Sequence, residues 1–381
     1  MHPKSRRRSS FSCQTPLHFF TNARRPTREG IDMEKFRHKA ALKILATVFG
    51  VGLLAGTASA RDDGATLKAL YEAANAAGER EVVVYNPNTN ANTPIFDAFS
   101  KRFPNIKIVG VDLFGPNLTT RLEAEAASGR AAGDVLYTTA NEMPGYASKG
   151  FLVSYTPTTA TGIDQKYVGQ DSKWFDWTLT VSGPFYNKTY LKAAEAPKSW
   201  QELVDPRWKK QLSISTLQSV SGTGQALTAL TLAGKLDRAW FEHLAANQPV
   251  VSQANAQAIQ AVASGQATIG LDVPYHFFKA AAKKGAPFEF IFPKEGVISI
   301  PLNEALLNGA PHPYAAKLFI NWLFSSEAQA VLADIGMQGT MPDAPKVVGA
   351  SDGLVFNVLD WRALVSQYPA QLAMYKEVFA N

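Results

Sequence analysis

Apolar runs and helical patterns alternate along the chain after residue 60. Residues 66–77 show the periodicity of an amphipathic helix, and residues 81–85 form a short apolar run that is typical of a buried parallel strand. The pattern then continues as helix, strand, helix and strand at 94–103, 106–111, 118–127 and 134–137. Strands and helices that alternate with short connections predict an α/β fold, with a mainly parallel sheet flanked by helices.

A second round of the same alternation begins near residue 178. The strands expected here are 178–186, 212–215 and 268–271, and a long helix is expected to start at Gln225. Two sheets in one chain predict two lobes that face each other across a cleft. Clefts between lobes are a common place for small-molecule sites, so the ligand is expected there.

The loops that follow the first and third strands are rich in Asn and Thr. In open α/β sheets, ligands bind outside the carboxyl ends of the strands, so these loops are candidate ligand contacts. The residues singled out are Asn86, Asn88, Thr89, Thr138, Thr139 and Asn141. Their side chains offer neutral donors and acceptors, which suit a small polar solute.

The first 60 residues have the pattern of segments outside the folded part. Residues 33–60 resemble a secretory signal peptide, with basic residues at 35–43, an apolar stretch at 44–56, and the small-residue pattern Ala58-Ser59-Ala60. A transmembrane anchor is the alternative, but the apolar stretch is shorter than the roughly 20 residues that a membrane helix needs. Residues 1–32 are basic and patternless, and we interpret them as an over-extended start of translation, with a disordered tail as the alternative.

Removing this leader changes the charge and leaves no cysteine. The full chain carries 38 Lys and Arg against 32 Asp and Glu, whereas residues 61–381 carry 27 against 29, a net charge of −2. This balance gives no reason to expect nucleic acid or an anionic membrane as a partner. Cys13 is the single cysteine, so the rest of the chain has no disulfide, thiol nucleophile or thiolate metal site.

Six short motifs occur in the order in which one family has them. They are Val84-Tyr85-Asn86, 133–138, 186–189, 197–209, Ser221-Gly222 and 261–265. Together they resemble the periplasmic solute-binding proteins of ABC importers, in the group that includes binders of ferric iron, phosphonates and sugar phosphates. The resemblance implies a type II periplasmic-binding fold. Its first lobe would be 61–180, completed by about 300–350, and its second lobe 181–299, completed by about 351–381.

The resemblance also implies a function and an anion site. It implies a periplasmic monomer that delivers a small organic anion to an inner-membrane permease, with no catalysis and no cofactor. Ser221, Gly222 and Thr223 align with the helix start that holds an anion in this family, and Asn255 aligns with an assisting Asn. Free N–H groups and the positive end of the helix dipole favour an anion at such a helix start, although an ordinary capped helix is the alternative.

A ferric-iron binder is the main alternative within the family. Its metal is held by two adjacent tyrosines and, in many members, by a His and a Glu. Here the tyrosine pair aligns with Tyr275-His276, the loop 86–90 contains no His, and Thr139 stands at the Glu position. One phenolate and one imidazole cannot neutralise a trivalent ion, so no metal site is expected. Asp272 is expected either to meet a ligand ammonium or to cap the following turn.

Two other classes of protein fit less well. A secreted enzyme on a related two-lobe fold would need a nucleophile paired with a base, and no Gly-x-Ser-x-Gly motif is present. An adhesive or structural protein is compatible with export, but the polar loops at the strand ends do not favour it. The aromatic residues Trp174, Phe175 and Trp177 either stack on a ligand or pack the hinge.

We predict that export removes residues 1–60, because the small-residue pattern that a signal peptidase recognises ends at Ala60. N-terminal sequencing of the chain from a periplasmic fraction should begin at or within a few residues of Arg61. Recovery of the chain in the membrane fraction with the apolar stretch retained would contradict this prediction.

Overall fold

The computed structural model describes residues 63–139, 141–219, 221–347, 349–350 and 353–380. The expected N-terminal extension at 1–32 and signal peptide at 33–60 therefore lie outside the described residues. Within the described ranges, no helix combines the length and the apolar character that crossing a membrane requires.

Helices and strands alternate in the described chain, as the sequence pattern indicated. The α-helices are α1 Gly64–Ala76, α2 Thr89–Arg102, α3 Gly115–Ser128, α4 Met143–Ser148, α5 Gly222–Leu232, α6 Arg238–Ala246, α7 Asn255–Ala263, α8 Tyr275–Lys283, α9 Pro313–Leu323, α10 Ser326–Ile335 and α11 Trp361–Val378. Short 3₁₀ helices lie at Thr158–Ala160, Gln165–Tyr167, Gln170–Ser172, Glu202–Val204 and Pro206–Trp208.

Helix α2 begins five residues earlier than the sequence pattern indicated. The side chain of Asn88 accepts a hydrogen bond from the Ala91 amide at 3.1 Å and so caps the helix, which starts at Thr89. Pro94, which suggested a helix start, lies inside the helix. Thr89 and Asn90 are consequently part of the first helical turn rather than of a loop.

The strands pair into one continuous sheet, whereas the sequence suggested two. They are β1 Glu81–Asn86, β2 Lys107–Asp112, β3 Val135–Thr139, β4 Phe175–Asn187, β5 Leu212–Ser215, β6 Val250–Ser252, β7 Ile269–Pro274, β8 Phe288–Phe290, β9 Val297–Leu306, β10 Gln338–Gly339 and β11 Phe356–Val358. The order along the sheet is β2-β1-β3-β9-β4-β7-β5-β6, with β8 and β10 on β4 and β11 on β9.

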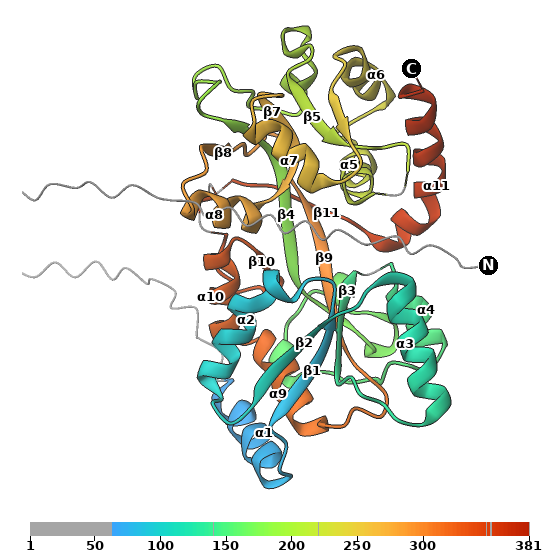
Figure 1. Ribbon diagram of the computed structural model, residues 1–381. Helices are drawn as coiled ribbons and strands as arrows, with labels where there is room; N and C mark the ends of the chain where they lie inside the picture. Colours follow the sequence, from blue (N-terminus) through green and yellow to red (C-terminus); the bar gives the residue numbers. More distant parts are fainter. Residues whose placement is uncertain (1–62, 140, 220, 348, 351–352, 381) are drawn as a thin grey trace, which may run out of the picture. The chain divides into compact units, whose positions relative to one another are not determined.

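The two longest strands, β4 and β9, join two lobes (Figure 1). They pair antiparallel from Phe175 opposite Glu304 to Ser182 opposite Ile298. One end of β9 pairs with β3 in the first lobe, and the far end of β4 pairs with β7 and β8 in the second. The two predicted sheets merge because each strand is long enough to belong to both lobes.

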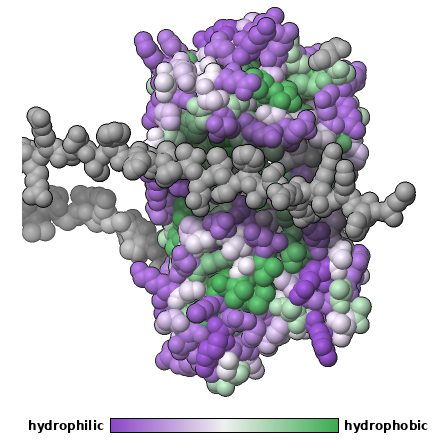
Figure 2. Space-filling model, viewed as in Figure 1, coloured by the Kyte–Doolittle hydropathy of each residue, from purple (hydrophilic) through white to green (hydrophobic). Residues whose placement is uncertain are grey.

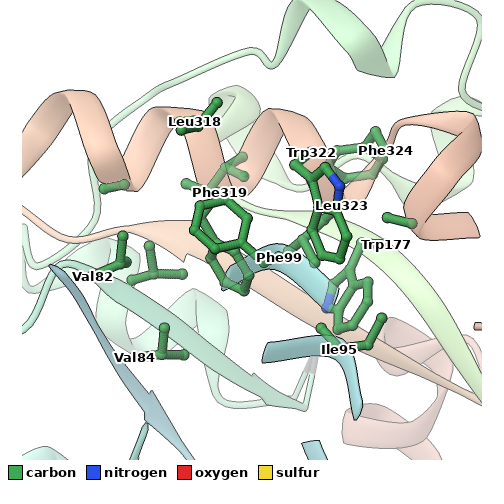
Figure 3. Packing of buried hydrophobic residues seen from close by; sticks show 14 of the residues in the cluster. Val82, Val84, Ile95, Phe99, Trp177, Leu318, Phe319, Trp322, Leu323 and Phe324 are labelled. Carbon is green, nitrogen blue, oxygen red and sulfur yellow. The ribbon is translucent and has the colours of Figure 1, made fainter. Parts of the chain in front are cut away.

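Each lobe has its own apolar core. The first-lobe core draws on residues 67–177 and 306–341, and the second-lobe core on residues 186–298 and 359–375. Between α2 and α9, the ring of Phe99 meets Phe319 at 5.1 Å and Trp322 at 5.5 Å between centroids, both edge to face (Figure 3). Separate cores leave the joining strands and the segments beside them as the links between the lobes.

The space-filling view shows a mainly hydrophilic surface with apolar residues gathered on the first lobe over β1 and β2 (Figure 2). Val109 of the edge strand β2 is 38% exposed there. By contrast, Trp174, Phe175 and Trp177 are at most 3% exposed. The structure therefore agrees with the hinge-packing interpretation of these three side chains.

We expect Gly270→Ala to lower the free energy of unfolding by about 1–3 kcal/mol, because a Cβ there would overpack the core. That Cβ would lie 2.1 Å from Cε1 of Phe185, a ring that is 1% exposed and packs against Phe288. Urea denaturation measures the change. Gly145→Ala in α4 is the matched control, since its Cβ would meet no atom within 4 Å. A Gly270→Ala midpoint equal to that of the parent would contradict the packing described.

Candidate functional site

Two of the residue groups expected from the sequence lie at the carboxyl ends of parallel strands in the second lobe. Strands β5 and β6 are parallel neighbours, and the Thr216 amide beyond β5 donates to the Ser252 carbonyl at the end of β6. The chain then enters α5 after Ser221 on one side and α7 at Asn255 on the other. The sheet therefore directs the starts of both helices toward the same edge.

The start of α5 has a capped amide and two unpaired ones. Ser221 adopts an extended backbone, and its Oγ accepts from the Gly224 amide at 3.0 Å while donating to the Thr216 carbonyl at 2.8 Å. The amides of Gly222 and Thr223 have no hydrogen-bond partner among the described residues. The Ser221 hydroxyl thus fixes the helix end, and the two backbone N–H groups are the donors left for a ligand.

Tyr368 is a candidate contact that the sequence did not reveal. It belongs to α11, and its hydroxyl oxygen lies 3.5 Å from the Ser221 amide that points toward it. Burial raises the pKa of the Tyr368 phenol, so the group keeps its proton at neutral pH. A protonated phenol whose oxygen already accepts can still donate to an anion at the start of α5.

Asp272 lies beneath the same helix start. The Thr223 hydroxyl donates to Asp272 Oδ2 at 2.9 Å and accepts from the Ser215 hydroxyl at 2.7 Å, so a buried polar chain runs from β5 to β7. Asp272 Oδ1 has no partner with hydrogen-bond geometry among the described residues. Burial raises the pKa of Asp272 to about 6, against the lowering effect of the Thr223 and Ser182 hydroxyls. The Thr223 hydroxyl is therefore committed to Asp272, and only its amide faces outward.

In the first lobe, Asn86 and Asn88 shape the loop between β1 and α2. Asn86 is fully buried, and its Oδ1 accepts from the Asn88 amide at 3.0 Å and from the Asn92 side chain at 3.1 Å. Thr89 donates from both its amide and its hydroxyl to Asp112, at 2.7 and 2.5 Å. Asn86 thus supports the loop from beneath, while Asn88 lies nearer its surface.

Hydrogen bonds also join the predicted residues at the end of β3, where Thr138 and Thr139 are the last two residues of the strand. Thr138 is buried and donates to Glu142 Oε2, and the Thr139 hydroxyl donates to Asn141 Oδ1 at 2.6 Å. Beside Thr138 in the sheet, Asn303 of β9 donates to the carboxylate of Asp176 on β4.

The Asp176–Asn303 pair is a second feature that the sequence did not single out as a site. Burial raises the pKa of Asp176 well above its usual value, although Arg362 lowers it. Asn303 Oδ1 has no partner among the described residues. The pair therefore places polar groups on the joining strands, next to the end of β3.

Tyr275 and His276 begin α8 but differ in their surroundings. The Tyr275 ring is 6% exposed and meets Phe290 at 4.8 Å between centroids. Burial lowers the pKa of His276 to about 4, so the imidazole is neutral at pH 7, and its Nδ1 is buried without a partner in the described part of the chain. Among the described residues, no three His, Cys, Asp or Glu side chains gather as a metal site would require.

A cavity of about 490 Å³, here called the interlobe pocket, joins elements of both lobes. Its walls come from the first turn of α2 and the last turn of α10 in the first lobe, and from one face of α8 in the second. Two residues expected from the sequence, Asn88 and His276, line it. The Ser221–Thr223 group does not.

Among curated proteins, the chain is 36% identical over 144 residues to an uncharacterized protein of Haemophilus influenzae. That match covers 36% of this chain and 40% of the relative's length. A putative 2-aminoethylphosphonate-binding periplasmic protein of Salmonella typhimurium is 27% identical over 248 residues, covering 63% of this chain and 71% of the relative.

Solved structures share the fold at low identity. Iron-bound HitA from Pseudomonas aeruginosa aligns with a TM-score of 0.60 and 19% identity, covering 78% of this chain and 99% of that one. AfuA from Actinobacillus pleuropneumoniae, with fructose-6-phosphate bound, aligns with a TM-score of 0.60 and 21% identity, covering 79% and 98%. The expected type II periplasmic-binding fold is therefore confirmed. The family model described as bacterial extracellular solute-binding protein matches residues 133–367, more than half of the chain, and the chain belongs to that family.

Proposed function

We propose that this chain is the periplasmic solute-binding component of an ABC importer and that it captures a small organic anion at the start of α5. The solute class is a phosphonate, a phosphate ester or a carboxylate, and an inner-membrane permease receives it. The chain works as a monomer without a cofactor and without catalysing a reaction. The observation that carries the proposal is the pair of unpaired amides at Gly222 and Thr223, set at the positive end of a helix.

The surroundings of this helix start support an anion. Tyr368 adds a phenol that keeps its proton, and Asn255 begins α7 on the same sheet edge. Two amides and a phenol are neutral donors, so they bind an oxyanion without a counter-ion. The named ligands of the Salmonella relative and of AfuA, an aminophosphonate and a sugar phosphate, both carry such oxyanions.

Ferric iron is the alternative solute, since HitA was solved with iron bound. The structure offers fewer ligands for a trivalent ion than donors for an oxyanion. Tyr275 is packed in an aromatic cluster, and the neighbouring position holds the neutral His276 instead of a second phenol.

A thermal-shift screen separates the classes of solute when it compares phosphonates, sugar phosphates and carboxylates with ferric citrate, amino acids, polyamines and neutral sugars. Native mass spectrometry of the purified chain then identifies a co-purified solute.

Gly222→Pro removes one of the two donor amides, and we expect it to weaken anion binding by about one to two decades, the cost of one charge-assisted hydrogen bond. Proline suits this position because Gly222 is the first helical residue and Ser221 before it is extended. Isothermal titration with the best anion from the screen measures the change. Gly222→Ala keeps the amide, and its Cβ would meet no atom within 4 Å, so it should bind like the parent. Equal affinity of the Pro and Ala variants would refute the anion site.

Anion binding should weaken as the pH rises through about 6, because Asp272 then ionises beneath the site and repels the ligand. A sulfonate or sulfate probe, whose own charge is constant, should lose roughly tenfold in affinity between pH 5 and 7.5. Asp272→Asn cannot ionise, so its titration should be flat over this range. A pH dependence that persists in Asp272→Asn would place the titrating group elsewhere.

The ionisation of Asp272 should also change the free energy of unfolding, which urea denaturation at several pH values measures. The folded-state pKa lies above that of an unfolded Asp, so the stability contributed by neutral Asp272 is complete below about pH 4 and is lost as the pH approaches about 6. The parent should therefore lose more stability than Asp272→Asn over this interval.

A further inference from the structure

The interlobe pocket combines a ligand-sized volume with two lysines, Lys283 and Lys284, that form no ion pair within the described chain. Its volume of about 490 Å³ falls within the range of roughly 300–1,000 Å³ that is usual for small-molecule sites. A cavity of similar size beside the 156–175 segment, about 480 Å³, is lined by no charged side chain. A smaller cavity of about 280 Å³ contains Glu125, but Tyr85, Arg121 and the Ala132 amide already bind that carboxylate.

One face of α8, together with the residue that caps its end, supplies three lysines to the pocket. Lys279, Lys283 and Lys284 recur at helical spacing, so they line the same side of the helix. Lys279 donates to the carbonyl of Asp334 at the end of α10, and burial lowers its pKa. Lys283 and Lys284 are exposed and form no ion pair with other described residues. Asp334 is the one acidic residue among the described residues of the wall, so cationic groups outnumber acidic ones there.

The part of the opposite wall that α2 forms carries no side-chain charge, and Asp334 is the charged residue on the α10 part. The wall contains Ala91 and Pro94 of the first turns of α2, and Ile335 at the end of α10. The positive end of the α2 dipole faces the same space, since Asn88, the N-cap, and Asn90 line it. On α8, Phe277 is 41% exposed and Ala280 lies one turn further on. An occupant would thus meet apolar surface on its body and ammonium groups at one end.

We propose that the interlobe pocket binds an organic anion with an apolar body, such as an aromatic or branched aliphatic phosphonate or carboxylate. The site is separate from the start of α5, and it does not rest on the proposed function. Lys283 and Lys284 bind the charged head, and Phe277, Pro94 and Ile335 enclose the apolar group. Because α2 and α10 belong to the first lobe and α8 to the second, the ligand contacts both lobes at once.

Isothermal titration of the exported chain with phenylphosphonate tests the proposal. The comparison compounds are methylphosphonate, an anion without a ring, benzyl alcohol, a neutral ring, and benzylamine, a cationic ring. Phenylphosphonate should bind with a dissociation constant of a millimolar or below, and more tightly than the neutral and cationic rings. Binding that favours benzylamine, or the absence of phenylphosphonate binding, would overturn the proposal.

Two Trp substitutions on α8 locate the binding. Ala280→Trp fills the pocket from an exposed position, and we expect it to weaken phenylphosphonate binding at least tenfold. Ala282→Trp is the matched control, since Ala282 is also exposed on α8 but does not line the pocket. It should bind within twofold of the parent. Equal binding by the two variants would show that the pocket is not the site.

Two further experiments test the contribution of the lysine charges and separate the pocket from the anion site at the start of α5. The double variant Lys283→Gln, Lys284→Gln should weaken phenylphosphonate binding about tenfold and reduce its dependence on salt. Gly222→Pro removes a donor amide of the α5 site, so the part of phenylphosphonate binding that Ala280→Trp abolishes should persist in it. If phenylphosphonate binding is lost in Gly222→Pro but kept in Ala280→Trp, the anion site on α5 stands and the pocket proposal falls. If phenylphosphonate binding is instead kept in Gly222→Pro and lost in Ala280→Trp, the result supports the pocket proposal alone.

Discussion

The antiparallel pairing of β4 with β9 is the constraint on which the rest of this structure depends. These two strands carry the chain from one core to the other, and every other strand of the main sheet is ordered outward from them. The ends of β3 and β7, where candidate residues lie, are both held against this pair. If one of these strands shifted by one residue against the other, its side chains would turn to the opposite face of the sheet, and the strand would no longer fit either core.

The proposed anion site depends on neutral donors placed above a buried acid. The first turn of α5 presents amides. The Ser215–Thr223–Asp272 chain beneath it ends in a carboxyl group, one oxygen of which has no hydrogen-bond partner among the residues that the structure describes. Burial and the hydroxyl bonds act on this group in opposite directions, and burial is the larger effect. The site therefore combines attraction from the helix end with repulsion that depends on the proton at Asp272.

The sequence predicted the features that local patterns encode. The alternation of elements follows from short stretches of chain. The pattern placed the start of α5 at Gln225, three residues later than the observed Gly222, and only the family resemblance pointed to Ser221–Thr223. The contact of Tyr368 with Ser221 could not be predicted, because it joins positions 147 residues apart without a pattern that links them. The start of α2 was placed too late, because Pro94 was read as a start signal while Asn88 supplied the cap. The interlobe pocket depends on how three helices pack, and no single segment encodes that.

The discontinuous first lobe also determines when this protein can fold. Strands β1 to β3 are made early, yet the helices that cover their core, α9 and α10, begin at Pro313 and Ser326. A chain emerging from the ribosome must therefore reach α9 and α10, far along its length, before that core can close. Contacts so distant in sequence slow folding, because a long loop must be ordered before they form. Until α9 and α10 have been made, the apolar side chains of β1 to β3 therefore lack the cover that these helices provide in the folded lobe.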